Sequence, residues 1–247
     1  MIELSEVYKS FGEKRVLRGL SLSVKVGETL VILGRSGSGK SVTLKTIVGL
    51  LRPDRGSVVV NGVDLRAATR AQLGAVRRDV AYLFQTGALV NWMTVRENVE
   101  LPLLERREQG RAEIRGRAAA ALESLGMTEA ADQYPEEISG GMRKRAALAR
   151  VLVQDPKAVL YDEPTAGLDP ILARTVAELI RGVQTGGRRA ALIVTHDLEL
   201  AFATAARIGL HHEGRLVEVA TPDVFRASRH PVIREFLDAP VPAGVRS

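Results

Sequence analysis

The pattern of apolar and polar positions in the first quarter of the chain predicts strands and one helix. Residues Ile2 to Val7 and Leu20 to Val26 alternate apolar and polar side chains, as half-buried strands do. Thr29 to Leu33 is a short continuous apolar run, which favours a strand buried on both faces. A helix is expected over Val42 to Leu51, and a strand with a tight turn over Ser57 to Gly62.

The pattern changes in the next stretch, from about residue 66 to residue 137. This stretch is rich in Ala, Arg, Glu and Leu, and Arg111 to Leu125 favours a helix. Pro102 should start or kink a second helix within Asn98 to Arg107. We interpret the stretch as a mainly helical lobe inserted into an α/β core.

Strands and helices then alternate along the rest of the chain. The expected elements are a helix over Gly140 to Gln154, a strand over Ala158 to Tyr161, a helix near Ile171 to Gln184, a strand over Ala190 to Val194 and a helix over Leu198 to Ala206. Such alternation predicts a parallel sheet with right-handed crossovers. The prolines from Pro231 onward predict an extended tail that begins near His230.

Composition narrows the functional classes. The length of 247 residues fits one large domain, or one domain with a lobe, and allows a substantial core. The absence of cysteine excludes a disulfide framework, thiol catalysis and a cysteine-based zinc site. The net charge of +6 is scattered and aromatic residues are few, so nucleic-acid binding is not indicated, while attraction to an anionic membrane surface stays open. Without a signal-peptide core or a run of about 18 apolar residues, we expect a soluble, cytoplasmic protein.

The strongest chemical signal lies between the apolar strand that ends at Leu33 and the helix that follows. It consists of Gly34, Arg35, Ser36, Gly37, Ser38, Gly39, Lys40 and Ser41, and it matches the pattern G-x-x-x-x-G-K-[ST] of a phosphate-binding loop, or P-loop. Its glycines let several backbone N–H groups point at phosphate oxygens, and the helix adds its positive N-terminal end. Lys40 would reach the β- and γ-phosphates of a nucleotide, and the Ser41 hydroxyl would bind Mg²⁺.

A P-loop of this kind needs an acidic partner on a neighbouring strand. Asp162 and Glu163 follow the apolar run that ends at Tyr161. Asp162 would hold Mg²⁺ and Glu163 would polarise the attacking water, because successive residues of a strand point in opposite directions. Alone, such a pair could equally be a strand end with a solvated turn. The P-loop favours the catalytic interpretation.

Three further segments could bind anions or sense phosphate. Ser139 precedes two glycines and a helix, an arrangement that suits either an ordinary helix cap or a second anion site. Asp169 ends the run Pro164 to Asp169. His196 follows the last predicted buried strand, where an isolated histidine often has only a structural role.

The order of these segments resembles that of the ATP-binding cassette (ABC) ATPases over nearly the whole chain. The P-loop, Gln85 in LFQTGAL, the SGG helix, LYDEPTAGLD and THD stand in the order and at the spacing typical of that family. The resemblance implies a P-loop NTPase α/β core with an N-terminal antiparallel β subdomain and a helical subdomain at about residues 86–150. The ATPase domain would span residues 1–238, with a tail at 239–247. ATP, Mg²⁺ and a two-fold homodimer are implied as well.

The resemblance also implies residue roles. The nucleotide-binding set would comprise Phe11, Gly34, Arg35, Ser36, Gly37, Ser38, Gly39, Lys40, Ser41, Val42, Ser139, Gly140, Gly141, Met142 and Asp169. Phe11 would stack on adenine, although it could also be an apolar turn residue. Residues 139–142 would contact the γ-phosphate of ATP held by the other subunit, and the loop of Asp169 would cross the dimer interface.

Three residues would carry catalysis in this resemblance, and three would be associated with the metal. Glu163, His196 and Gln85 form the catalytic set, with His196 sensing the γ-phosphate and Gln85 linking Mg²⁺ and the lytic water to a transmembrane partner. The metal set is Ser41, Gln85 and Asp162.

Met142 departs from the family pattern, which usually has Gln there. Together with FQTGAL and the C-terminal FLD-x-P-V-P segment, it resembles the Mla-type ATPases that serve MCE lipid transporters. This implies phospholipid transport with an MlaE-like permease and, indirectly, an MCE-domain protein, at the cytoplasmic face of the inner membrane. The segment from Gln85 to Leu104, which includes Trp92, would dock the permease or pack within the helical lobe.

Several alternatives to lipid transport stay open. A regulatory or mechanical ABC ATPase of the cell-division or lipoprotein-release type shares every motif except the GGM and the tail. An importer ATPase for another solute is a further reading, whereas a DNA-repair or translation ABC protein usually has two cassettes or large insertions. The tail could latch onto the partner subunit or be a disordered end.

Overall fold

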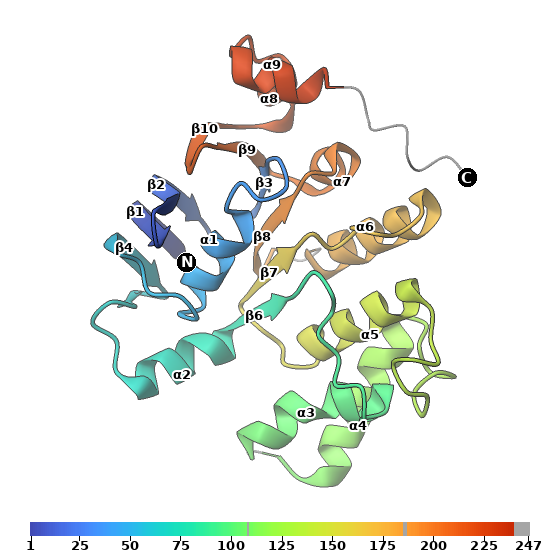
Figure 1. The fold of residues 1–247 in the computed structure, drawn as a ribbon. Coiled ribbons are helices and arrows are strands. Elements are labelled where there is room, and N and C mark those ends of the chain that lie inside the picture. The colour runs from blue at the N-terminus through green and yellow to red at the C-terminus, as the bar shows by residue number, and fades with distance from the viewer. Residues whose placement is uncertain (108, 185–186, 240–247) are drawn as a thin grey trace.

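A computed structural model gives the structure of the chain and describes residues 1–107, 109–184 and 187–239. The strands are β1 (Ile2–Phe11), β2 (Lys14–Val24), β3 (Thr29–Leu33), β4 (Arg55–Val60), β5 (Val63–Asp64), β6 (Val80–Leu83), β7 (Ala158–Asp162), β8 (Ala190–Thr195), β9 (Arg207–His212) and β10 (Arg215–Ala220). The helices are α1 (Lys40–Ile47), α2 (Arg70–Asp79), α3 (Val95–Arg106), α4 (Arg111–Ser124), α5 (Gly140–Leu152), α6 (Pro170–Gln184), α7 (Leu198–Thr204), α8 (Pro222–Arg226) and α9 (Pro231–Leu237). Figure 1 shows their arrangement.

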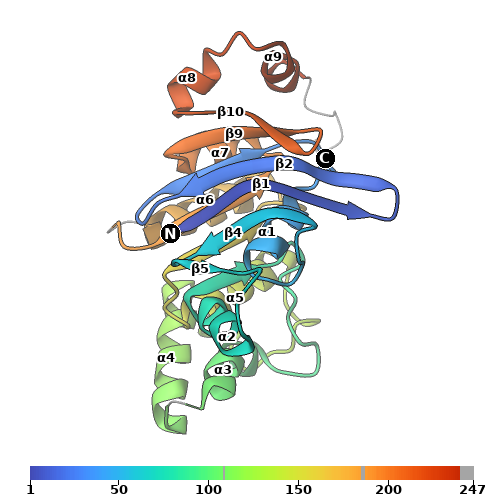
Figure 2. The same ribbon diagram turned by 90° about the vertical axis from the view of Figure 1, so that its left-hand side faces the viewer.

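Two sheets form the body of the molecule. One has four strands in the order β2-β1-β4-β5, which pair antiparallel. The other has six in the order β10-β9-β3-β8-β7-β6, parallel except for β10. The predicted parallel sheet is therefore confirmed. Helix α1 lies between the two sheets, while α5, α6 and α7 cover the opposite face of the larger one (Figures 1 and 2).

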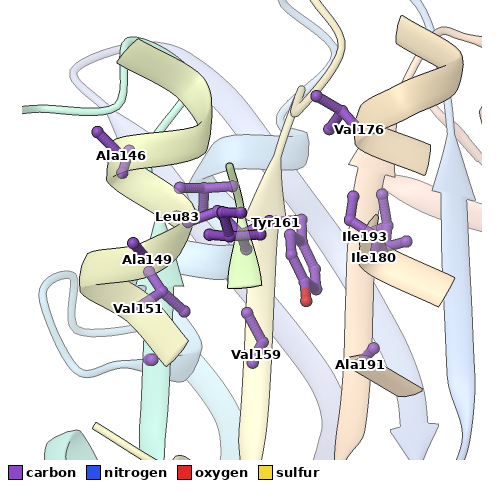
Figure 3. Close-up of a cluster of buried hydrophobic side chains, with 14 of the residues drawn as sticks. Leu83, Ala146, Ala149, Val151, Val159, Tyr161, Val176, Ile180, Ala191 and Ile193 are labelled. Carbon is purple, nitrogen blue, oxygen red and sulfur yellow. The ribbon is translucent and has the colours of Figure 1, made fainter. Parts of the chain in front are cut away.

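The central strand β3 is apolar at every position after Thr29 because both of its faces are buried. All five of its residues are buried. Because successive side chains of a strand point to opposite faces, Val31 and Leu33 pack toward α5–α7, whereas Leu30 and Ile32 pack toward α1 and the smaller sheet. Figure 3 shows the first of these two cores, where Tyr161 of β7 and Ile193 of β8 meet side chains of α5 and α6.

The helical lobe lies further along the chain than the pattern of residues 66 to 137 predicted, and it includes α5. Residues 80–83 form β6, which pairs in parallel with β7, and α2 packs against β6. Because these two elements belong to the sheet layer, the lobe starts after β6. Helices α3, α4 and α5 pack against one another there (Figure 2). Pro102 lies inside α3.

The prediction of an extended tail from His230 was wrong for its first part. Residues 231–237 form α9, with Pro231 in its first turn, where a missing N–H costs nothing. The His230 ring accepts a hydrogen bond from the Val232 N–H at 3.3 Å and so caps this helix. Pro240 and Pro242 lie outside the described residues. Strands β9 and β10 and helix α8 were not foreseen.

No helix within the described residues is both long enough and apolar enough to cross a membrane.

Candidate functional site

The P-loop connects the carboxyl end of β3 to the start of α1, as the sequence predicted. Gly37 and Gly39 have φ angles of 75° and 115°, which a residue with a side chain rarely adopts. A Cβ atom on Gly39 would also lie 2.8 Å from the Val16 side chain. Ser36 and Gly37 are exposed, while Val42 is half-buried in the first turn of α1. The glycines are therefore required by the backbone path itself.

Lys40 is buried, and its ammonium is bonded to three oxygen atoms of its own chain. Its ammonium donates to the carbonyls of Gly34 at 2.6 Å and Arg35 at 3.1 Å. It also lies 3.1 Å from Glu163 Oε1, in an ion pair whose two side chains are only 5% and 10% exposed. The P-loop lysine and the candidate base thus neutralise each other in this structure. A nucleotide phosphate would compete with Glu163 for the same ammonium.

The Ser41 hydroxyl and Asp162 form the candidate metal site. Ser41 Oγ donates to Asp162 Oδ1 at 2.8 Å. Tyr82 of β6 donates to the other oxygen, Oδ2, at 2.7 Å and so fixes the carboxylate. Burial, followed by the hydrogen bond to Asp162, raises the Tyr82 pKa, which keeps its hydroxyl a donor.

These oxygen donors fit Mg²⁺. That ion takes few protein ligands, typically one or two carboxylates or hydroxyls, and completes its octahedron with phosphates and water. Among the described residues there is no group of three or more histidine, cysteine or acidic side chains that would suit a cage built by the protein alone. Gln85, the third predicted metal-associated residue, is exposed just after β6.

Glu163 adopts a strained backbone conformation at the end of β7. Its φ of 47° is unusual for a residue with a side chain, and such strain gathers at functional sites. Its Oε2 accepts from Thr195 Oγ1 at 3.1 Å and from the His196 N–H at 3.2 Å, and lies 2.9 Å from His196 Nδ1. The structure thus joins the two predicted catalytic residues, Glu163 and His196, directly.

The loops after β7 and β8 are tied together beside this pair. Thr165 donates to Asp197 Oδ2 at 2.8 Å, and Oδ1 of Asp197 caps α7 through the Leu200 N–H at 3.0 Å. His196 itself stays exposed. Its ring can therefore contact Glu163 on one side and a bound ligand on the other.

Phe11 ends β1 with 47% of its surface exposed. Lys9 Nζ lies 5.5 Å from the centre of the Phe11 ring and is held there by Asp54 at 2.8 Å. The Lys9 ammonium thus lies over one face of the ring and is attracted to it, which favours an aromatic side chain at position 11. An exposed ring at this point is compatible with stacking on a base.

A cavity of about 200 Å³ lies between the P-loop, the end of β9 and α9. Arg35 pairs across its rim with Glu235 at 2.6 Å, an exposed contact of small energetic value. Inside, His211 is 2% exposed, and no hydrogen bond from another described side chain or backbone group reaches its ring nitrogens or the buried Ser38 hydroxyl. Burial, followed by the charge of Lys40, lowers the pKa of His211 from 6.5 to about 4.

The Ser-Gly-Gly segment at the start of α5 is open. Ser139 accepts from the Met142 N–H at 3.2 Å, so it caps its own helix as predicted. Ser139 and Gly140 are exposed, and a Cβ on Gly140 would approach only the Arg143 side chain, at 3.8 Å. Gly141 differs, because a Cβ there would lie 2.8 Å from Leu172 of α6. Met142 is half-buried and packs against the main core, which the sheet shares with the lobe.

Asp169 caps α6. Its Oδ1 accepts from the N–H groups of Ile171 and Leu172, both at 3.0 Å. This contact is intramolecular, and the role of its loop at a dimer interface stays a prediction.

Sequence reasoning missed Tyr82 and Lys144. The hydroxyl of Tyr82 in the otherwise apolar run of residues 80–83 was a usable signal, because a buried hydroxyl seeks a partner. Lys144, on α5, donates to the carbonyls of Gln85 and Glu163, and only the fold brings those two together.

Comparison with known proteins agrees with this geometry. The family model of the ABC transporters matches residues 17–166. A Mycobacterium tuberculosis protein named as a probable ribonucleotide transport ATP-binding protein is 39% identical over 96% of this chain and 66% of its own length. This chain thus spans slightly less than two thirds of that relative.

Two further relatives carry different names. The chloroplastic trigalactosyldiacylglycerol 3 protein of Arabidopsis thaliana is 37% identical over 98% of this chain and 75% of its own length. A methionine import ATP-binding protein of Paraburkholderia xenovorans is 37% identical over 96% and 70%.

A solved structure matches the fold over most of the chain. The dimeric ATP-binding cassette MJ0796, bound to ADP and phosphate, superposes with a TM-score of 0.82 at 31% identity, over 90% of this chain and 99% of that one. With its P-loop, acidic strand end and helical lobe in this arrangement, the chain belongs to the ABC transporter family as one of its ATPase cassettes.

Proposed function

We propose that two copies of this cassette bind and hydrolyse ATP between them and thereby drive lipid transport through a separate membrane permease. The observation that carries the two-copy arrangement is the contrast within one chain. Lys40 of the P-loop and Glu163 are buried and paired with each other, and we call this part of the site the P-loop edge. Ser139 and Gly140, by contrast, form an exposed helix start. An exposed helix N-terminus suits a phosphate that another molecule supplies.

Residues at the P-loop edge would bind the phosphates of ATP and accept the proton of the attacking water. The γ-phosphate would draw Lys40 away from Glu163, which leaves Glu163 Oε1 free to accept a proton from water. Thr195 and His196 meanwhile keep Oε2 in place. Ser41 and Asp162 would hold Mg²⁺, which would neutralise charge on the β- and γ-phosphates, and Gln85 is the third residue expected to associate with it.

A mass measurement tests this arrangement. Glu163→Gln should bind ATP without turning it over, so that light scattering finds the 26.7 kDa chain doubled in mass when Mg²⁺ and ATP are added. The same variant with Lys40→Ala should remain monomeric. A Glu163→Gln chain that saturates with ATP and stays a monomer contradicts the proposal.

The lipid assignment is supported by two independent likenesses. The GGM and FQTGAL sequences resemble those of the Mla-type ATPases. A relative with 37% identity bears the name of a diacylglycerol lipid, trigalactosyldiacylglycerol. On this proposal the cassette sits at the cytoplasmic face of the inner membrane, bound to an MlaE-like permease, with an MCE-domain protein as an indirect partner and the exposed Trp92 in the docking segment.

A second candidate, import of a small solute, has its own support in the methionine-import relative. Purification of the tagged chain from membranes of its own cell separates the candidates. A multi-pass permease carrying lipid supports lipid transport, and a permease with a soluble substrate-binding protein supports import. A partner with a single membrane span indicates the regulatory type instead.

A further inference from the structure

Lys144 connects two parts of the hydrolysis site. It lies in the first turns of α5, two residues after Met142, and its ammonium donates to the Gln85 carbonyl. The same nitrogen lies 3.5 Å from the Glu163 carbonyl oxygen. Gln85 follows β6 and Glu163 follows β7, so one side chain of the lobe helix contacts the ends of two neighbouring strands.

A second cation fixes the same loop to the same helix. Arg150 donates to the carbonyls of Gly87 at 2.6 Å and Ala88 at 2.7 Å. Ala147 lies between the two cations on α5. A Cβ atom on Gly87 would be only 3.1 Å from the Cβ of Ala147, so the loop and the helix are in close contact. Lys144, Ala147 and Arg150 recur at three-residue spacing along one side of the helix. Residues 85–88 are therefore attached to α5 along two turns.

These cations depend on the carbonyls they bind. Within the described residues, neither Lys144 nor Arg150 forms an ion pair with a carboxylate. Burial lowers the pKa of Lys144, although the charges of Asp162 and Glu163 act in the opposite direction. Moving α5 without moving residues 85 and 163 would leave an ammonium partly buried and unpaired, which is costly. The three elements should therefore move together.

We infer that Lys144 is a positioning residue that transmits occupancy of one ATP site to the other. The inference rests on the proposed function, in which Ser139 to Met142 of one copy meet ATP held by the second copy. That contact would displace the start of α5. Through Lys144, the displacement would move the backbones of Gln85 and Glu163 in the same copy. These two residues would then reach the positions needed for hydrolysis at the P-loop of that copy. Binding at one site thus prepares hydrolysis at the other.

The test is the ATP dependence of hydrolysis by the full chain. The wild-type Hill coefficient should exceed 1, with an upper limit of 2 for two sites. Lys144→Met should lower the coefficient to about 1 and reduce kcat more than it changes KM. Arg145→Met is the matched control, because Arg145 donates to the carbonyls of Leu125 and Gly126 within the lobe and touches neither strand end. It should retain the wild-type coefficient and rate.

Trp92, the only tryptophan of the chain, gives a second readout. It follows Gln85 by seven residues and is 81% exposed. A non-hydrolysable ATP analogue should shift its emission in the wild type and in Arg145→Met. In Lys144→Met the shift should be smaller, because only Arg150 then fixes the loop of residues 85–88 to α5, while a fluorescent ATP analogue still binds. If Lys144→Met does not fold, Lys144→Gln, whose shorter neutral side chain cannot reach both carbonyls, takes its place, and Lys144→Arg should restore cooperativity.

A wild-type coefficient of 1, or an unchanged coefficient in the folded Lys144 variants, overturns the inference. These results leave the proposed function intact if Glu163→Gln still doubles in mass with ATP. Failure of that doubling overturns the proposed function itself, so the two failures are distinguishable.

Discussion

The two ends of the proposed ATP site differ in how far one chain completes them. At the P-loop edge, both oxygens of Glu163 are engaged, by Lys40 on one side and by Thr195 and His196 on the other. At the start of α5, Ser139 caps its own helix and its neighbour Gly140 is exposed. One end is internally satisfied, and the other is prepared for something outside the chain.

Solvation explains the difference. Buried charges must find partners within the chain, because an unpaired one is expensive. Exposed N–H groups at a helix start can be satisfied by water until a ligand replaces it. We call the part around Lys40 and Glu163 the closed end of the site and the start of α5 its open end, and we expect substitutions at the closed end to have the largest effects.

Glu163→Gln should break the closed end most severely. Removing a general base typically costs between about 10²-fold and 10⁴-fold in rate, and the amide can no longer accept a proton from water. Phosphate release should be measured at saturating ATP. Glu199→Gln, which changes an exposed glutamate paired with Arg174, is the control and should hydrolyse at the wild-type rate. Wild-type hydrolysis by Glu163→Gln would remove the base assignment.

Near the closed end, His211 is buried, but its ring nitrogens have no hydrogen-bond partner among the described residues. The stability of the fold should therefore depend on pH through this side chain. Its pKa is lowered in the folded state, so the unfolded chain takes up a proton first as pH falls from about 6.5 to about 4. The free energy of unfolding should therefore decrease across that window, by up to about 3 kcal/mol from this group.

Urea titrations at several pH values measure the decrease. In His211→Leu this contribution should vanish, whereas His212→Leu, a change at the exposed neighbour, should retain it. Equal pH dependence in all three proteins would show that His211 has partners that the fold does not reveal.

Lys40→Ala should weaken nucleotide binding. Hydrogen bonds to charged groups contribute about 1.5–3 kcal/mol, so a fall of about 10-fold to 100-fold in affinity is expected. Titration with a fluorescent ATP analogue measures it. Lys45→Ala, on the same helix, should bind normally, and an undiminished affinity in Lys40→Ala would place the phosphates elsewhere.

Asp169→Ala should have the smallest effect, about 1 kcal/mol of stability, because it removes one helix cap. Asp169→Asn preserves the cap, since asparagine is as good at that position. If Asp169→Asn keeps its stability in urea but hydrolyses ATP more slowly, the loop has a role beyond α6. Equal rates would confine Asp169 to capping.

The sequence predicted the local parts of the site better than the contacts between distant segments. The glycine-rich loop that leads to Lys40 and the apolar strand that ends in Asp162 and Glu163 are local signals. The structure has the loop between β3 and α1 and the two acidic residues at the end of β7, as predicted. The contacts of Tyr82 and Lys144 could not be read, because they join residues 80 and 19 positions apart that only the sheet order brings together.

The C-terminal region shows a second reason for error. The prolines from Pro231 onward predict extended chain, yet proline fits the first turn of a helix equally well, and Pro231 lies there in α9. Helix α9 packs against the main core through Ile233, which is fully buried. Tertiary burial decided the local structure there.

The most direct test of a site shared between two copies is a mixing experiment. Lys40→Ala disables the P-loop half, and Gly140→Asp places a carboxylate against the partner's phosphate at a position where a side chain has room. At an ATP concentration too low to saturate Lys40→Ala, each variant alone should be nearly inactive. In an equal mixture, half of the dimers pair one of each and contain one intact site, so up to about a quarter of the wild-type rate should return, and less to the degree that the two sites activate each other. If each chain cleaved ATP alone, Gly140→Asp would hydrolyse ATP at the wild-type rate without a partner, and that result would contradict this account.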